Sequence, residues 1–209
     1  MKNHRARTPL LLAFLLAVIP SGMAFSSPLL SLGSRVGFLY SHTRLPELVG
    51  AIQSGWQANI SASLDSRDVF AQATDVTDAV PTRGFAFSGS LGLDIFSLGQ
   101  SAPQSDGNLY RAWQGLGLSL RGGVRSPAFR LPLVGLMASV EVEAGGGLRA
   151  TKYTGTGLVS ANPALVAQAG LDIAISRHIA LGLALPIEFA WKSGGTALMF
   201  GLCGTFRYR

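Results

Sequence analysis

The chain has 209 residues and a net charge of +6, yet only 13% of its residues are charged, about half of the roughly 25% that is typical of a soluble domain. Hydrophobic residues make up 48% of the chain and glycine contributes 26 residues. This composition excludes intrinsic disorder, and it argues against an ordinary cytosolic globule because few charges remain to cover a wetted surface. The single cysteine, Cys203, excludes an internal disulfide framework and a multi-cysteine metal site. The length accommodates one domain.

Residues 1–24 have the three-part layout of a cleavable secretory signal peptide. Three basic residues within 1–7 precede an apolar run over 10–19, and Gly22-Met23-Ala24 supplies small residues for cleavage. The run is shorter than the ~20 residues of a membrane-spanning helix, which favours a signal peptide over an uncleaved anchor. Cleavage lowers the basic residues from 17 to 14 against 11 acids, so the net charge falls from +6 to +3. The remaining basic residues are scattered, which argues against nucleic acid as a partner.

The remainder, 25–209, alternates between apolar and small or polar residues with a period of two. Phe85, Phe87, Leu91 and Leu93, for example, interleave with alanine, serine and glycine. Successive side chains of a strand point to opposite faces, so each such run predicts a strand. Eight strands are expected, over 32–42, 55–65, 84–96, 112–124, 134–149, 164–176, 179–191 and 196–208.

The two faces of these strands differ in charge. The apolar faces contain no charged residue, whereas the opposite faces carry Arg35, Asp94, Arg121, Glu141, Glu143, Arg149, Asp172, Glu188 and Arg207 among glycine, alanine and serine. A soluble sandwich or barrel needs a strongly polar outer face. A transmembrane barrel places apolar residues against lipid and polar residues inside, and its closure removes strand edges that lipid cannot satisfy. The sequence therefore predicts an all-β, antiparallel, up-and-down transmembrane β-barrel with eight strands, with a secreted soluble β-fold as the alternative.

An even number of strands places both ends of the barrel on the periplasmic side. The expected external segments are 43–54, 97–111, 150–163 and 192–195, and the expected periplasmic segments are 66–83, 125–133 and 177–178. Residues 66–83 are long for a periplasmic turn. Either the strand boundaries there are different or the segment folds back into the barrel, with a short helix from Asp68 to Thr74. Pro186 lies within an expected strand and predicts a bulge.

The last expected strand ends in Phe206-Arg207-Tyr208, preceded by Gly204. Together with the signal peptide and the strand count, this ending resembles the small eight-stranded outer-membrane barrels, the group of OmpX, the OmpA membrane domain and OmpW. The resemblance covers most of 25–209 and implies insertion into outer-membrane lipid by the barrel-assembly machinery, which would read Gly204, Phe206 and Tyr208. Arg209 departs from the family pattern, which usually ends on an aromatic residue. OmpW is nearest in length, and similarity to it implies a narrow channel or pocket for small solutes.

The interior of an eight-stranded barrel is just wide enough to be filled by side chains or to hold one small ligand. Small residues on the inward faces of the last three strands leave room, namely Gly170, Ala174, Ala180, Gly182, Ala184, Ala190, Ala197 and Gly201. In one interpretation the inward charges line a narrow path gated by Arg121 with Glu141 and Glu143. In the other they pair across the lumen and plug it, since buried charges must be paired or solvated. The candidate lumen residues are Arg35, Asp94, Arg121, Glu141, Glu143, Asp172, Glu188 and Arg207.

Two other functions remain open. A plugged barrel would act as a structural or adhesive protein that displays its external segments to host or matrix ligands. A lipid-modifying enzyme would need a nucleophile near His42, but Asp65-Ser66 is expected at the opposite end of the barrel. The sequence therefore predicts a non-enzymatic protein without a cofactor or a metal site.

Overall fold

The computed structural model describes residues 29–44, 51–70, 84–100, 112–154, 159–192 and 195–209. Its strands are β1 (Leu29–Arg44), β2 (Ala51–Asp65), β3 (Ala86–Gln100), β4 (Ala112–Arg125), β5 (Phe129–Arg130), β6 (Met137–Thr154), β7 (Val159–Ala174), β8 (Ile179–Lys192) and β9 (Gly195–Tyr208). The expected signal peptide lies outside the described residues.

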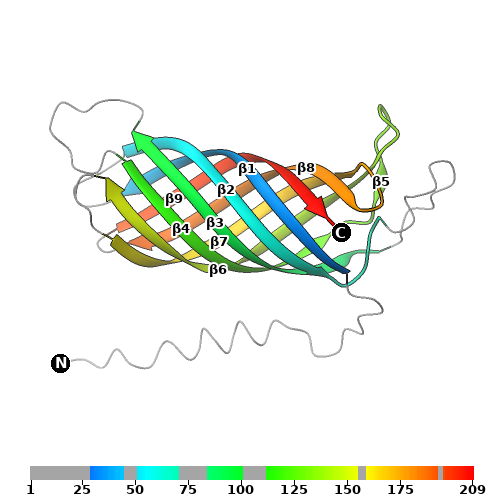
Figure 1. The fold of residues 1–209 in the computed structure, drawn as a ribbon, viewed down its shortest axis with the longest axis horizontal. Helices are drawn as coiled ribbons and strands as arrows, with labels where there is room; N and C mark the ends of the chain where they lie inside the picture. Colours follow the sequence, from blue (N-terminus) through cyan, green and yellow to red (C-terminus); the bar gives the residue numbers. More distant parts are fainter. Residues whose placement is uncertain (1–28, 45–50, 71–83, 101–111, 155–158, 193–194) are drawn as a thin grey trace, which may run out of the picture.

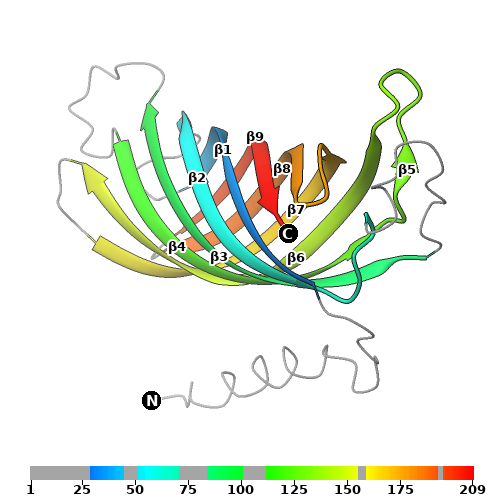
Figure 2. The same ribbon diagram turned by 45° about the vertical axis from the view of Figure 1, so that its right-hand side comes forward.

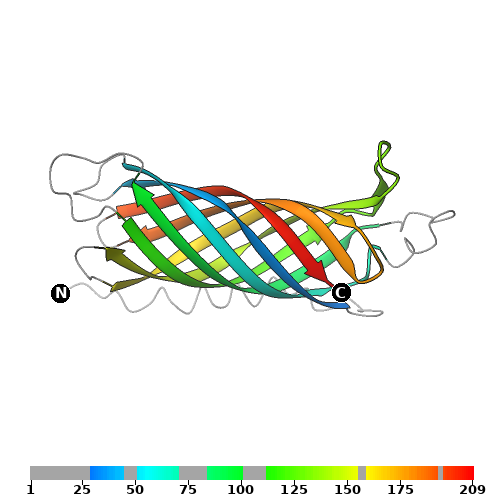
Figure 3. The same ribbon diagram turned by 45° about the horizontal axis from the view of Figure 1, so that its top comes forward.

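Antiparallel pairing joins the eight long strands into a closed barrel (Figure 1). Neighbouring strands follow the order β4-β3-β2-β1-β9-β8-β7-β6, and β4 pairs with β6 from Ala112↔Thr154 to Arg125↔Glu141. β1 begins and β9 ends at the same end of the barrel (Figures 1 and 3). We call this the periplasmic end and the opposite end the external end. The predicted all-β, eight-stranded, up-and-down barrel is confirmed.

The short strand β5 belongs to a hairpin at the periplasmic end. Residues 134–136 were expected to open a long strand, but they form the turn of this hairpin instead. The amide of Leu131 donates to the carbonyl of Leu136 at 2.8 Å, and Gly135 adopts a φ of +68°, a conformation that favours glycine. β6 therefore begins at Met137. At the external end the strands run further than expected, and β6 reaches Thr154 rather than 149.

The outer face of the barrel is apolar. Along the strands the exposed large side chains alternate with buried ones, as predicted: Phe38 is 72% exposed and Ile60 is 68% exposed, whereas Arg35 and Asn59 are buried. Aromatic side chains gather near both ends of this face. Tyr40 and Phe200 stack with ring centroids 5.8 Å apart towards the external end, while Phe206 and Tyr208 are exposed at the periplasmic end. Such aromatic girdles mark the two interfaces of a membrane barrel.

Among the described residues, none forms a helix with the length and apolarity that a membrane-crossing helix requires.

Pro186 interrupts a ladder without a bulge. The β8–β9 ladder pairs Ala184↔Cys203 and resumes at Ile187↔Phe200, so the register is the same on both sides of the interruption. On the other side, Pro186 pairs with Gln168 of β7 in unbroken register. The expected bulge is therefore wrong. Proline has no N–H to donate. The β8–β9 ladder therefore lacks pairs at Pro186, but neither strand contains an extra residue there.

The exposed face predicts a depth-dependent response to charge. Leu118 lies in the middle of β4 and is half exposed. We expect Leu118→Arg to lower the free energy of unfolding in phospholipid vesicles by about 2–4 kcal/mol, because an arginine at the bilayer midplane loses its hydration. Leu30→Arg, near the periplasmic end of β1, should cost no more than about 1 kcal/mol. Urea titration of the folded band on unheated gels measures both, and equal costs at the two positions would contradict a lipid-facing wall.

Candidate functional site

The lumen contains all nine inward-facing charged residues that the alternation predicts. Arg35, Asp94, Arg121, Glu141, Glu143, Arg149 and Asp172 are buried, and the side chains of Glu188 and Arg207 are each 12% exposed. Two further charged residues, Asp65 and Arg125, are also buried there. Ion pairs and hydrogen bonds organise these eleven residues into two clusters, one at mid-height and one near the periplasmic end.

The mid-height cluster is centred on Asp94 of β3. Its carboxylate accepts hydrogen bonds from Arg35 at 2.8 Å and from Asn59 at 2.8 Å, and it forms an ion pair with Arg149 at 3.0 Å. Arg149 also makes a bidentate contact with Glu188, at 2.7 and 2.5 Å. Such paired N–H···O bonds are strong and geometrically specific. Asp94 is thereby neutralised from two sides of the barrel.

Gln168 of β7 joins Arg121 to this cluster. Its side-chain oxygen accepts a hydrogen bond from Arg121 at 2.7 Å and another from Arg35. Its side-chain nitrogen donates to Glu143 at 2.9 Å, and Arg121 lies 3.4 Å from the same carboxylate. Arg121 is therefore held by two neighbours within a closed network.

The periplasmic cluster contains two arginines and three carboxylates. Arg125 lies 2.9 Å from Glu141 and 2.8 Å from Asp172. Arg207 lies 2.6 Å from Glu141 and 3.4 Å from Asp172. Asp65 lies further away, 3.9 Å from Arg125 and 3.8 Å from Arg207. The sequence grouped Glu141 with Arg121 and Glu143, whereas in the structure its ion pairs are with Arg125 and Arg207 of the periplasmic cluster.

The small inward residues do not leave the room that the sequence suggested. A Cβ placed on Gly182 would lie 2.8 Å from Oγ1 of Thr205 and 2.9 Å from Oδ1 of Asp172. The guanidinium of Arg149 lies where a side chain on Gly117 would project. A side chain at Gly182 would also meet the backbone carbonyl of Leu171, so the space beside both glycines is already occupied. Gly182 and Gly117 therefore accommodate the groups packed around them.

An apolar cluster fills the lumen at the external end. It consists of Leu39, Phe96, Leu98, Ala164, Ala190, Ala197 and Met199, all of them on inward-facing positions near the external ends of their strands. Leu98 is fully buried and Met199 is almost so. Ala190 and Ala197, which were expected to leave room, are covered by this cluster. Packed apolar side chains, rather than charges, thus occupy the lumen at this height.

The periplasmic opening is closed by residues that follow β2. Val69 and Phe70 are buried and pack with Ala86, Ala128 and Met137. The expected fold-back of 66–83 is therefore confirmed for residues 66–70. These residues form bends and a turn rather than the start of a helix, and the remainder of the expected helix lies outside the described residues.

The C-terminal residue holds this closure in place. The guanidinium of Arg209 lies 3.0 Å from Asp68 and 4.5 Å from the centroid of the Phe70 ring. Burial lowers the pKa of Arg209, and the Asp68 carboxylate opposes that shift; the guanidinium stays charged because arginine remains protonated in proteins. Asp68 also accepts a hydrogen bond from the amide of Phe70 at 2.9 Å. Arg209, a departure from the family pattern, is thus an ion-pair and cation–π partner of the plug.

Several lumen residues escaped the sequence prediction for identifiable reasons. Asp65 is the last residue of its expected strand, 55–65, and Arg125 lies one residue beyond its expected strand, 112–124. Both have the same parity as their inward-facing neighbours, Asn59 and Arg121, so carrying the alternation through the ends of these strands finds them. Gln168 is uncharged, and no local signal marks it as the side chain that links two ion pairs.

Cys203 and His42 are two other residues with side chains that could be reactive. Cys203 is buried on the inward face and accepts a hydrogen bond from the side-chain nitrogen of Gln57 at 2.9 Å. His42 follows Ser41 in β1, where alternation places the two side chains on opposite faces of the wall. Within the described part of the chain, no group of three histidine, cysteine or acidic side chains is arranged to hold a metal ion.

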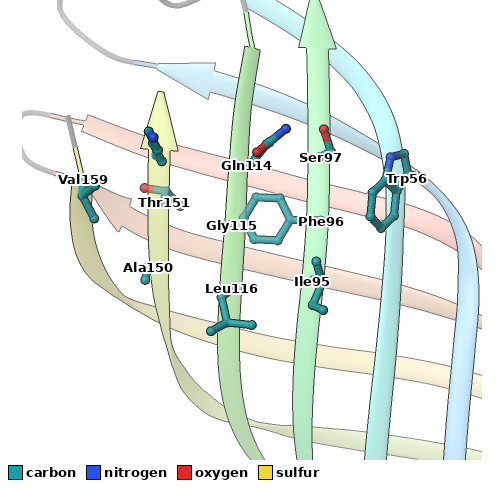
Figure 4. Close-up of a pocket in the computed structure, with 11 residues that line it drawn as sticks. Trp56, Ile95, Phe96, Ser97, Gln114, Gly115, Leu116, Ala150, Thr151 and Val159 are labelled. Atoms are coloured by element: carbon teal, nitrogen blue, oxygen red, sulfur yellow. The ribbon is translucent and has the colours of Figure 1, made fainter. Parts of the chain in front are cut away.

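An open hollow of about 400 Å³ crosses β2, β3, β4, β6 and β7 near their external ends (Figure 4). Trp56, Ile95, Leu116 and Val159 line it and are all exposed. Buried Phe96 and Thr151 also line it, so the hollow is bounded by residues of both faces of the wall.

The closed barrel, its apolar exterior and its charged lumen define the protein as a small eight-stranded β-barrel of the outer-membrane type. No family model matches the chain, and no curated protein matches it significantly. Among solved structures, the chain is similar to Neisserial surface protein A, with a TM-score of 0.53 and 12% identity over 88% of this chain and 99% of that one. This likeness supports the fold.

A second solved structure with detectable similarity is Ail, the attachment invasion locus protein of Yersinia pestis, in complex with the heparin analogue sucrose octasulfate. Its TM-score is 0.41, with 12% identity over 86% of this chain and 99% of that one.

Removing Arg125 tests the periplasmic cluster. The side chain is almost fully buried among three carboxylates. We expect Arg125→Ala to lower the free energy of unfolding by about 3–5 kcal/mol, because an uncompensated buried charge remains. The double variant Arg125→Ala with Glu141→Gln should recover part of that loss. Urea unfolding in vesicles provides the measurement, and a loss below about 1 kcal/mol for the single variant would show that the cluster is solvated rather than paired.

Removing the charge of Arg209 should loosen the periplasmic closure while leaving the barrel folded. In Arg209→Gln, Asp68 loses its ion pair and Phe70 its cation partner, so hydrogen exchange of residues 66–70 should accelerate. The free energy of global unfolding should change by less than about 1 kcal/mol, since Asp68 is partly exposed. Arg209→Lys is the matched control and should exchange at an intermediate rate. Unchanged exchange in the glutamine variant would rule out this role for Arg209.

Proposed function

We propose that the protein is a closed barrel of the bacterial outer membrane that displays its external segments to host or matrix ligands. The observation that carries this proposal is the filling of the lumen, where paired charges lie between an apolar cluster at the external end and a plug at the periplasmic end. A barrel that is filled in this way has no open path for solutes through its lumen. Its contacts with other molecules would therefore be made by its external segments.

The same packing weighs against an OmpW-like channel for small solutes. A conducting path needs charged groups that water can reach, but Arg121 and Glu143 are only 4% and 2% exposed and are bonded to Gln168. Transport gated by Arg121 would require this network to break and both apolar closures to move. The channel is therefore the competing proposal, which a conductance measurement tests directly.

The charge of the external end suggests the chemistry of a ligand. The charged residues at the external strand ends and in the segments between them are Arg44, Glu47, Asp106, Arg111, Lys152 and Lys192. Basic residues outnumber acidic residues there by four to two. Such an excess attracts polyanions, so a sulfated polysaccharide such as heparin is a suitable probe.

The proposal keeps the expectation of a non-enzymatic protein without a cofactor, and it places the barrel in a membrane. The apolar wall would contact outer-membrane lipid along its whole circumference. Phe206 and Tyr208 face outwards from β9, next to the wall position of Gly204, where the barrel-assembly machinery would read them.

Two readouts on one set of proteins test the proposal. The folded barrel in planar bilayers should show no discrete conductance steps, and Arg121→Ala should show none either because both apolar closures remain. Vesicles that carry the protein should bind a heparin-coated surface and cultured epithelial cells. Replacing the four basic residues Arg44, Arg111, Lys152 and Lys192 by glutamine should reduce binding at least tenfold without creating conductance.

The outcomes separate the two functions. Reproducible steps from the unaltered protein, increased by Arg121→Ala, would favour the channel and overturn the closed-barrel proposal. A barrel without conductance that binds neither heparin nor cells, or whose binding survives the replacement of these four basic residues, would overturn display of ligand-binding segments. Arg125→Lys serves as a control variant, since it changes a basic side chain near the periplasmic end, opposite to the four replaced residues.

A further inference from the structure

The hairpin between β4 and β6, residues 126–136, is a defined element that takes no part in the β4–β6 ladder that closes the wall. Phe129 and Arg130 pair with Ala138 and Met137, and its turn is fastened by the backbone bonds between Leu131 and Leu136 and between Gly135 and Leu131, at 2.8 and 2.9 Å. Figures 1, 2 and 3 show it projecting from the periplasmic rim to the side of the barrel, away from the barrel axis. It therefore extends over the region that surrounds the wall.

The tip of this hairpin is apolar and uncovered. Leu133 is 99% exposed and Val134 is 61% exposed, and Phe129 and Leu136 are each more than one-third exposed. By contrast, the base of the hairpin is anchored, since Ala128 and Met137 are buried in the apolar cluster with Val69 and Phe70. A rigid base thus presents hydrocarbon outwards, an arrangement that would be unfavourable in water.

The charge of the hairpin fits a lipid interface. Arg130 is its sole charged residue and is exposed. An apolar tip with an adjacent basic residue suits the boundary between acyl chains and headgroups, where the hydrocarbon is buried and the guanidinium reaches lipid phosphate. The neighbouring wall continues the same surface, because Val140 and Val142 of β6 face outwards below the hairpin. The hairpin thus adjoins the lipid-facing wall at the level where the membrane ends.

We propose that residues 126–136 form an interfacial membrane anchor, with Leu133 and Val134 at the headgroup–acyl boundary of the periplasmic leaflet and Arg130 beside a lipid phosphate. The occupant of the exposed tip is thus phospholipid. The anchor would fix the depth and rotation of the barrel at its periplasmic rim, as interfacial side chains do for other membrane proteins. This inference rests on the proposed membrane location of the barrel but not on the function of its external segments.

A nitroxide attached at the tip tests the proposal in vesicles of phosphatidylethanolamine and phosphatidylglycerol without any other protein. The background is Cys203→Ala, which removes the single, buried thiol. Labels are placed by Leu133→Cys at the tip, Leu118→Cys in the wall and Arg177→Cys in the exposed β7–β8 turn. Collisions with oxygen report lipid, and collisions with a water-soluble nickel chelate report water.

We expect the Leu133 label to collide with the nickel chelate at least fivefold less often than the Arg177 label, at a depth shallower than the Leu118 label. Adding Val134→Asp should return the Leu133 label to water, whereas Val134→Ala should not. If the Leu133 label is as accessible to the nickel chelate as the Arg177 label, the membrane-anchor proposal is overturned. The exposed tip would then be a binding surface for a periplasmic protein. The Leu118 label reports membrane insertion of the barrel independently, so failure of the location and failure of the anchor give different results.

Discussion

The pairing of β4 with β6 is the constraint on which the rest of the structure depends. Hydrocarbon offers no hydrogen bonds, so every backbone N–H and C=O in a membrane-spanning wall needs a partner within the wall. The β4–β6 ladder runs the whole length of β4, from Ala112 to Arg125, and leaves neither strand with a free edge. Once the wall is closed, alternation divides the side chains into two sets that cannot exchange. One set meets lipid, and the other must fill the lumen.

The filling of the lumen follows from that division. Eleven charged side chains inside a narrow barrel cannot each be hydrated as in bulk water, so they neutralise one another in two clusters. Asp94 is shared by Arg35 and Arg149, while Arg125 and Arg207 share the carboxylates of the periplasmic cluster. Glycines contribute to the same arrangement, because Gly117 on the neighbouring strand leaves the space that the guanidinium of Arg149 occupies. Charge pairing and glycine placement are therefore coupled.

The two ends are closed by different means. At the external end the strands themselves supply the closure, since the inward positions change from charged to apolar at Leu39, Phe96 and Leu98. At the periplasmic end the closure comes from residues outside the alternation, with Phe70 held beneath the C-terminal arginine. The wall accommodates Pro186 without a change of register, which shows how strongly the neighbouring ladders determine the position of each strand.

The sequence alone determined the class of fold, the number of long strands and the face on which each side chain lies. Those properties depend on a two-residue period that can be recognised within a single strand, and Phe38 and Asp94 illustrate that both faces were assigned correctly. Tertiary structure decided which charges pair, that Gln168 links them, and that the small residues accommodate side chains instead of an open path. The physical reason is that several of the partners lie on strands that are not neighbours: Arg35 of β1 meets Asp94 of β3, and Arg207 of β9 meets Glu141 of β6. Such encounters across the lumen depend on the tilt and stagger of the closed barrel, which no single strand encodes.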